Sequence, residues 1–182
     1  MIIILLIGDL VSNEGPGPSR PPDDCVIFAR PFVDAHPDYE WSIVYLTYDY
    51  DDIRAMEISK YWNSRNIPTK FLGFIDDYTD IENNELSFSA ELAESAIKQA
   101  VAADLILTHF EDGDYGHIHH KFVNTVANKI DVPKVYFAST FNYTDEYVTT
   151  PLDLAQFPLH RTVIEGFKDR DTGRYIITRK NN

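Results

Sequence analysis

The stretch LILTHFEDGDYGHIHH, residues 105–120, decides the fold. It begins with a short apolar run, 105–107, which predicts a buried strand. A polar loop with two glycines follows, and the chain then takes up the apolar spacing of a helix over 117–130. Four of the six histidines fall within this stretch. Because ligands bind at the carboxyl ends of the strands in open α/β sheets, we expect the active site here.

The segments on either side repeat the order of strand and then helix. Apolar and β-branched runs predict strands at 2–7, 42–47, 69–74 and 134–137, with a last strand at 175–179. Helical spacing predicts helices at 22–35, 51–65, 89–102 and 118–130, and a short one near 162–167. Pro31 should kink or end the first helix, and Ser87 or Ser89 could cap the third. This alternation predicts an α/β fold, a Rossmann-like three-layer α/β/α sandwich with a mostly parallel sheet.

Length and charge narrow the class of protein. The chain has 182 residues and a net charge of −13, so one domain over 1–182 is expected. Such an acidic surface repels phosphate groups, which argues against binding to nucleic acid or to an anionic membrane. The first apolar run lacks a basic leader, and no run is long enough to span a bilayer. Cys25 is the one cysteine, as in proteins of reducing compartments. We therefore expect a cytoplasmic protein, and the sequence leaves a homo-oligomer open.

The histidines are the first candidate site. His117 and His120 are three residues apart, so on a helix they lie on one face. Neutral imidazole is the commonest side-chain ligand of catalytic transition metals. Histidines spaced in this way also occur on protein surfaces by chance. His109 is expected to be a structural residue at the end of the strand.

The acid pair Asp23 and Asp24 is the second candidate. In the first turn of a helix, two carboxylates are explained by the helix dipole alone. The functional interpretation makes one a metal ligand and the other a general base that takes a proton from water. Taken alone, the pair fits the dipole explanation better.

Together the two signals resemble a known family. The segment YGHIHH, 115–120, is similar to the Tyr-Gly-His-Pro-Asp-His motif of the zinc-dependent de-N-acetylases often called PIG-L or LmbE-like. Three further segments resemble that family's second strand, following helix and third strand: 44–47, then Arg54 with Glu57, then 71–74 with Asp76. The order and spacing agree over roughly residues 1–140. The resemblance implies a single de-N-acetylase-like domain over 1–182.

The resemblance also implies roles for individual residues. In that family a His-Pro-Asp-Asp motif after the first strand supplies ligands and base, which places Asp23 as the base and Asp24 as a metal ligand. His120 would be another ligand of zinc or of a different divalent metal. His117 and Tyr115 would stabilise the oxyanion. The implied reaction removes an N-acetyl group from an amino sugar or sugar conjugate.

Two positions depart from the family pattern. Pro21 stands where the first histidine ligand is expected, and His119 stands where the family usually has an aspartate. The loop 9–20 resembles an insertion between the first strand and the motif, and Asp9 could supply the missing ligand.

These departures leave alternatives open. The segment AHPDYE, 35–40, is similar to the family's first motif, but it directly precedes the second strand and leaves no room for the expected helix. A catalytically degenerate relative that binds carbohydrate or acts as a scaffold is the second hypothesis. A nucleotide-binding Rossmann enzyme is the third, although no Gly-x-Gly-x-x-Gly follows the first strand.

Overall fold

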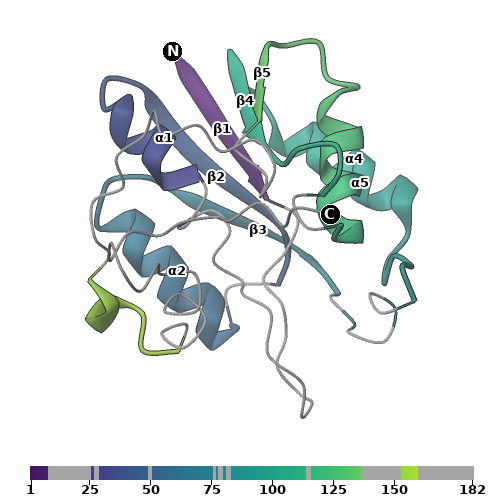
Figure 1. Ribbon diagram of the computed structural model, residues 1–182, viewed down its shortest axis with the longest axis horizontal. Helices are drawn as coiled ribbons and strands as arrows, with labels where there is room; N and C mark the ends of the chain where they lie inside the picture. Colours follow the sequence, from purple (N-terminus) through teal and green to yellow (C-terminus); the bar gives the residue numbers. More distant parts are fainter. Residues whose placement is uncertain are drawn as a thin grey trace, which may run out of the picture.

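The computed structural model describes residues 1–7, 26, 29–48, 51–75, 77, 80, 83–113, 116–136 and 153–159. Within them, five parallel strands form one sheet in the order β3-β2-β1-β4-β5 (Figure 1). The strands are β1 (Ile2–Ile7), β2 (Glu40–Thr47), β3 (Thr69–Phe74), β4 (Leu105–Thr108) and β5 (Lys134–Tyr136). The helices are α1 (Arg30–Ala35), α2 (Ile53–Asn63), α4 (Ala90–Ala100) and α5 (Ile118–Ala127), with a 3-10 turn η2 (Leu154–Gln156).

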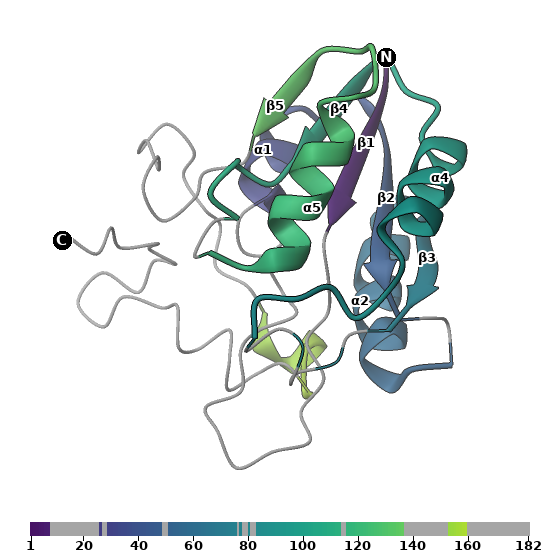
Figure 2. The ribbon, with the colours of Figure 1, turned by 90° about the vertical axis from the view of Figure 1, so that its right-hand side faces the viewer.

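The helices cover both faces of the sheet. Ile43 and Tyr45 of β2 belong to one buried cluster with side chains of α1 and α2, whereas Val44 and Leu46 belong to another with side chains of α4 and α5. Successive side chains of a strand point to opposite faces, so a strand buried on both sides is apolar throughout. Figure 2 shows α4 and α5 on the near side of the sheet and α1 and α2 behind it. The described residues thus form a mixed α/β structure with one open parallel sheet.

Local sequence signals explain where two of these helices begin. The Asp52 carboxylate accepts hydrogen bonds from the backbone N–H groups of Arg54 (2.8 Å) and Ala55 (3.1 Å) at the start of α2. The Ser89 hydroxyl accepts one from Leu92 N–H (3.3 Å) at the start of α4. These contacts satisfy N–H groups that lack partners in the first turn of a helix. The prediction that one of two serines caps α4 is confirmed for Ser89.

Other predicted boundaries were wrong or lie outside the described residues. In the described chain α1 begins at Arg30 and continues past Pro31, which stands in its first turn, so the proline does not end the helix; the predicted start at residue 22 lies outside the described residues. Proline is tolerated there because a first-turn N–H has no partner within the helix in any case. β2 begins two residues earlier than predicted, at Glu40. The segments 162–167 and 175–179 lie outside the described residues.

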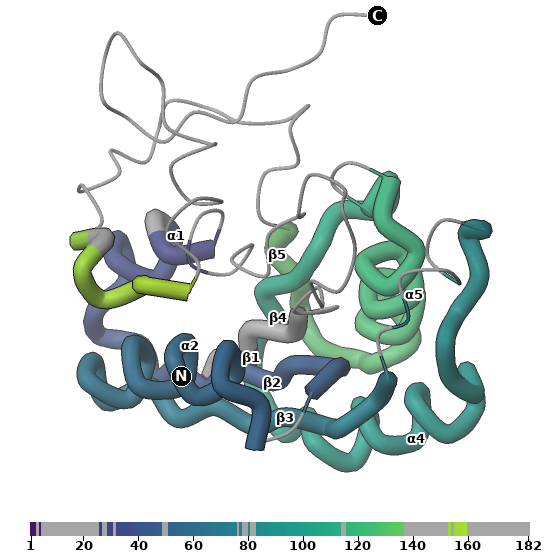
Figure 3. Tube along the Cα trace, turned by 90° about the horizontal axis from the view of Figure 1, so that it is seen from below, coloured from purple at the N-terminus to yellow at the C-terminus, as the bar shows by residue number. Residues whose placement is uncertain are grey.

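The order of the strands reverses near the middle of the sheet. From β1 the chain moves outward through β2 to β3, then returns to place β4 on the other side of β1. Leu6 of β1 is level with Thr108 of β4, so both strands end at the same edge. Figure 3 views the same arrangement from below. In the described part of the chain, no helix is both long and apolar enough to cross a membrane.

Candidate functional site

A compact turn connects the end of β4 to α5. The Gly113 N–H donates to the Phe110 carbonyl (3.1 Å), and the Gly113 carbonyl accepts from the N–H groups of Gly116 and His117 (3.2 Å each). Gly113 and Gly116 have φ values of +73° and +97°, which residues with a Cβ rarely adopt. The glycines of the loop therefore allow α5 to start directly beside the strand end.

His117 is the N-cap of α5 and lies just outside the helix. Its backbone is extended, with φ −65° and ψ 130°, and its ring Nδ1 accepts a hydrogen bond from His119 N–H (3.3 Å). The expectation that His117 and His120 share a helical face is therefore corrected for His117. Histidine is a rare N-cap, so the sequence did not reveal this role. The two rings nevertheless meet, with centroids 4.7 Å apart.

Three histidine rings form a buried cluster where β4 ends. The ring of His109 stacks on that of His120, with centroids 3.8 Å apart and planes 13° apart. The ring of His117 packs against the ring of His120. Their exposed fractions are 0% for His109 and His120 and 3% for His117. We call His109, His117 and His120 the histidine cluster. The alternative that these are chance surface histidines does not fit this burial.

His119 faces an aromatic neighbourhood. It is fully buried, and its ring lies 4.9 Å from that of Phe88, which precedes α4. Phe88 in turn contacts Phe122 and Phe74. The position where the resembling family has an aspartate thus packs against the ring of Phe88 and also against that of His117, with centroids 5.4 Å apart.

Asn124 supports the histidine cluster and was missed by the sequence analysis. It is buried in α5, and its side-chain Nδ2 donates to the backbone carbonyl of His109 (2.8 Å). The amide of Asn128 donates to Asn124 Oδ1 (3.0 Å), and the hydroxyl of Tyr136 in β5 donates to Asn128 Oδ1 (2.6 Å). This chain of hydrogen bonds ties the end of β4 to α5 and β5. The only sequence signal is that Asn124 follows His120 by four residues, one helical turn.

The described residues do not complete a metal site by themselves. Among them, no group of three or more His, Cys, Asp or Glu side chains could hold a metal ion. The nitrogens of the stacked His109 and His120 rings lie in two nearly parallel planes, whereas the ligands of a tetrahedral ion converge on one point. The remaining predicted residues, Asp23, Asp24 and Tyr115, lie outside the described residues, as do Pro21 and Asp9.

The segment 35–40, which resembles the family's first motif, lies at the other end of the sheet. His36 follows α1, and Glu40, level with Ile2, starts β2 at the amino edge. The His36 ring Nδ1 is 2.8 Å from the Phe32 carbonyl, and the ring lies between those of Phe32 and Tyr39. This segment is therefore not part of the histidine cluster.

Comparison with known proteins adds nothing to this description. No protein-family model matches the sequence, and no curated protein matches it. Function must accordingly be argued from the histidine cluster and its place in the fold.

Proposed function

We propose that this protein is a metal-dependent hydrolase that removes an N-acetyl group from an amino sugar or a sugar conjugate. The observation that carries the proposal is the histidine cluster, buried where β4 ends and α5 begins. Burying polar rings costs free energy unless hydrogen bonds or other contacts compensate. The same segment, 115–120, carries the similarity to the de-N-acetylase motif.

The topology supports this placement. We assign the fold to the Rossmann-like three-layer sandwiches, because the strand order is β3-β2-β1-β4-β5 and helices cover both faces. In such sheets ligands bind at the carboxyl ends of the strands where the strand order reverses. Here that point lies between β1 and β4. A reducing, cytoplasmic setting belongs to the proposal and is supported by the single cysteine.

The segment that carries the acid pair leaves the sheet near this point. It leaves β1 after Ile7, beside the end of β4. Its next described residue, Val26, is fully buried in the cluster that also contains Leu107 of β4. Asp24 is two residues before Val26. The start of this segment beside the end of β4 supports the proposal that Asp23 and Asp24 meet the histidine cluster.

The metal requires a carboxylate from that segment. His120 supplies an imidazole donor, and Asp24 would supply an oxygen donor, a combination found at catalytic zinc sites. A bound zinc ion, or another divalent ion, would supply Lewis acidity and lower the pKa of a water molecule.

The chain's own residues would move the protons. Asp23 would take a proton from the attacking water as its oxygen adds to the amide carbon. His117 and Tyr115 would donate hydrogen bonds to the oxyanion that forms; one such donor contributes about 3–4 kcal/mol at sites of this kind. When the carbon–nitrogen bond breaks, protonated Asp23 or His117 would return a proton to the leaving amine. The products are acetate and the free amino sugar.

Metal content and stability provide the first test. We expect purified protein to contain about one equivalent of zinc and added zinc to raise the Tm, because a ligand that binds only the native state stabilises it. His120→Ala should abolish both effects, whereas the control His36→Ala should retain them. Release of free amine from N-acetylglucosamine conjugates should follow the same pattern. A metal-free protein whose His120→Ala variant behaves like the wild type would exclude this function.

Pro21 favours one alternative, a catalytically degenerate relative that binds carbohydrate or serves as a scaffold. The side chain of proline cannot coordinate a metal. Mutating residues that merely hydrogen-bond to metal ligands lowers metal affinity by about 10–100-fold, so the loss of a ligand itself should lower it further. An unchanged Tm at saturating zinc, together with binding of the N-acetylated sugar without release of acetate, would support this alternative.

A further inference from the structure

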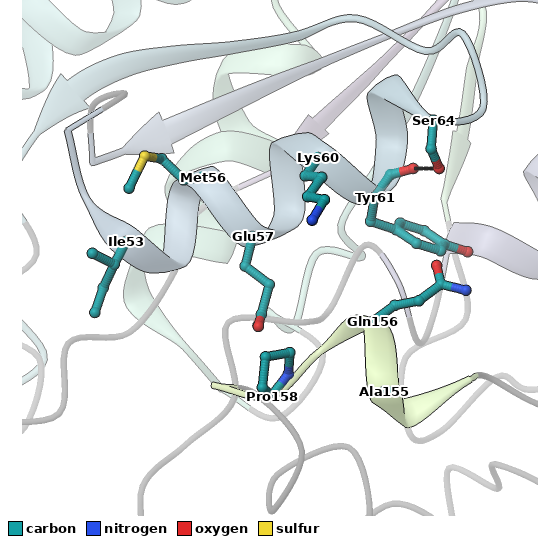
Figure 4. A pocket seen from close by; sticks show the side chains of 9 residues that line it. All are labelled: Ile53, Met56, Glu57, Lys60, Tyr61, Ser64, Ala155, Gln156 and Pro158. Carbon is teal, nitrogen blue, oxygen red and sulfur yellow. Dashed lines mark hydrogen bonds between the residues drawn. The ribbon is translucent and has the colours of Figure 1, made fainter.

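A pocket of about 660 Å³ lies between α2 and the segment 153–159 (Figure 4). This volume falls within the range of about 300–1,000 Å³ that small-molecule sites occupy. α2 packs on the face of the sheet opposite to α5. The pocket is therefore separate from the histidine cluster and belongs to no step of the proposed hydrolysis.

The two walls of the pocket, α2 and the segment 153–159, contact each other directly. Phe157 is fully buried, and its ring lies 4.7 Å from that of Tyr61 in α2. The backbone N–H of Leu159 donates to Glu57 Oε1 of α2 (3.0 Å). The segment 153–159 is thus fixed to α2 by an apolar anchor and a hydrogen bond.

One end of the pocket is apolar. Ile53 and Met56 are one helical turn apart on α2, and 60% and 50% of their surfaces are exposed. Pro158 lines the pocket from the opposite wall. Large apolar side chains that are exposed together, rather than singly, indicate a surface that contacts another molecule.

The middle of the pocket holds a positive charge. Figure 4 shows Lys60 extending from α2 toward Gln156 and Pro158. Within the described chain the Lys60 ammonium has neither an ion-pair nor a hydrogen-bond partner. The neighbouring Glu57 carboxylate is engaged by the N–H of Leu159. The Lys60 ammonium is the positive charge that can attract an anion into this pocket, against the repulsion of the Glu57 carboxylate and of a protein with net charge −13.

Tyr61 adds a polar wall. Its hydroxyl accepts a hydrogen bond from Arg65 Nη1 (2.8 Å). Burial raises the pKa of Tyr61 above its ordinary value, although the positive charge of Arg65 opposes this. The phenol therefore keeps its proton at neutral pH and adds no negative charge that would repel an anion.

We propose that this pocket binds a small amphipathic anion, with its charged group at Lys60 and its apolar group against Ile53, Met56 and Pro158. The chemistry fits an organic carboxylate, sulfonate or phosphate that carries an aromatic or short aliphatic part. It does not depend on the proposed hydrolase activity.

Two fluorescent probes that differ in charge test the proposal on the full chain. The first is 8-anilinonaphthalene-1-sulfonate, and the second is the uncharged N-phenyl-1-naphthylamine. We expect saturable binding of the sulfonate to folded protein, weakened by about fivefold to tenfold in Lys60→Gln, since a charge-assisted contact is lost. Binding of the uncharged probe should not change. Lys70→Gln, which makes the same charge change on an exposed residue of β3, serves as the matched control.

A second variant tests the apolar end. Met56→Ser should weaken binding of both probes, because it removes an apolar contact that they share. The Tm and far-UV circular dichroism of each variant establish that it is folded. The proposal is overturned if wild-type protein shows no saturable sulfonate binding, if Lys60→Gln binds it as tightly as Lys70→Gln, or if Met56→Ser changes neither probe.

Discussion

Gly113 fixes the backbone that leads into the histidine cluster. Its φ of +73° is unfavourable for any residue with a Cβ, and a Cβ there would lie 2.6 Å from the His117 carbonyl oxygen. Gly116 also has a positive φ, but nothing lies within 4 Å of its Cβ position. Gly116→Ala should therefore cost about 1–2 kcal/mol of unfolding free energy from the backbone alone. Gly113→Ala should cost more, because the loop must also shift.

Urea denaturation of the two glycine variants measures this difference. Equal losses would show that the close approach of Gly113 to His117 does not matter for stability. If Gly113→Ala also lowers zinc affinity and Gly116→Ala does not, the turn positions the proposed metal ligand.

Asn124 offers a second test at the residue scale. Asn124→Leu removes the donor to the buried His109 carbonyl and should lower the unfolding free energy by about 1–3 kcal/mol. Asn128→Ala, at an exposed residue of the same hydrogen-bond chain, should change it by about 0.5 kcal/mol or less. Thermal and urea denaturation would measure the difference between the two variants. Equal losses of stability would contradict the stabilising role assigned to the hydrogen bond of Asn124.

What the sequence revealed of the site differs from residue to residue. The location of the histidines could be predicted, because a strand followed by a glycine-containing loop and a helix is a local pattern. The stacking of His109 on His120 and the bond from Asn124 could not, because they depend on how α5 lies against β4. His109 was expected only to be a structural residue at the strand end.

At the scale of elements, the cap of α2 is the clearest case. Asp52 accepts hydrogen bonds from two backbone N–H groups in the first turn, so Asp52→Ala should cost about 1 kcal/mol. Asp52→Asn keeps an acceptor oxygen and should lose only a small part of this. Denaturant midpoints of the two variants compare them. A matching loss in both would mean that the charge, rather than the hydrogen bonds, stabilises the helix.

A second prediction concerns the contact between α4 and α5. Glu94 of α4 is bonded to Lys129, just beyond α5 (2.5 Å), and to Lys98 (2.6 Å), and these bonds lower the pKa of Glu94. A carboxylate whose pKa is lower in the folded state stabilises the fold above its unfolded pKa of about 4.3. That contribution is lost as the pH falls through the folded value. The Tm advantage of the wild type over Glu94→Gln should therefore shrink on acidification to about pH 3.

Salt and a control variant sharpen this measurement. Because the ion pairs of Glu94 lie at the protein surface, the Tm advantage of the wild type should be small and should also shrink at high ionic strength. Glu85→Gln, at an exposed carboxylate that forms no ion pair within the described chain, should show neither dependence. A Tm difference for Glu94→Gln that is constant with pH would contradict the assignment.

Strands could be predicted from the sequence more closely than helix ends. The bounds of β1 and β3 agree with the apolar runs at 2–7 and 69–74. α5 ends at Ala127, three residues before the predicted end. Helix ends depend on capping contacts and on proline geometry. Pro31 shows the difficulty, because a proline can stand either in the first turn of a helix or just after its end.

On the scale of the whole molecule, the sheet joins two separate apolar clusters. Neighbouring residues of β4 point to opposite faces: Ile106 belongs to the cluster with α4 and α5, and Leu107 to the cluster with α1 and α2. Alternation of strand and helix predicted a parallel sheet, but the order of the strands could not be read from it. The order depends on which side of β1 each crossover passes, and only the packing of the helices decides that.

This arrangement predicts that the two faces unfold together. The chain has two tryptophans, Trp41 and Trp62, and both lie in the cluster with α1 and α2. Their fluorescence therefore reports on that face alone. Ile106→Ala removes apolar volume from the opposite face and should cost about 2–5 kcal/mol. If the sheet makes one cooperative unit, the tryptophan transition must shift to lower urea by as much as the far-UV circular dichroism transition does. Leu107→Ala is the matched control, because its cavity lies on the tryptophan side. A fluorescence midpoint that stays at the wild-type value in Ile106→Ala, while the circular dichroism midpoint falls, would mean that the two faces unfold as independent units.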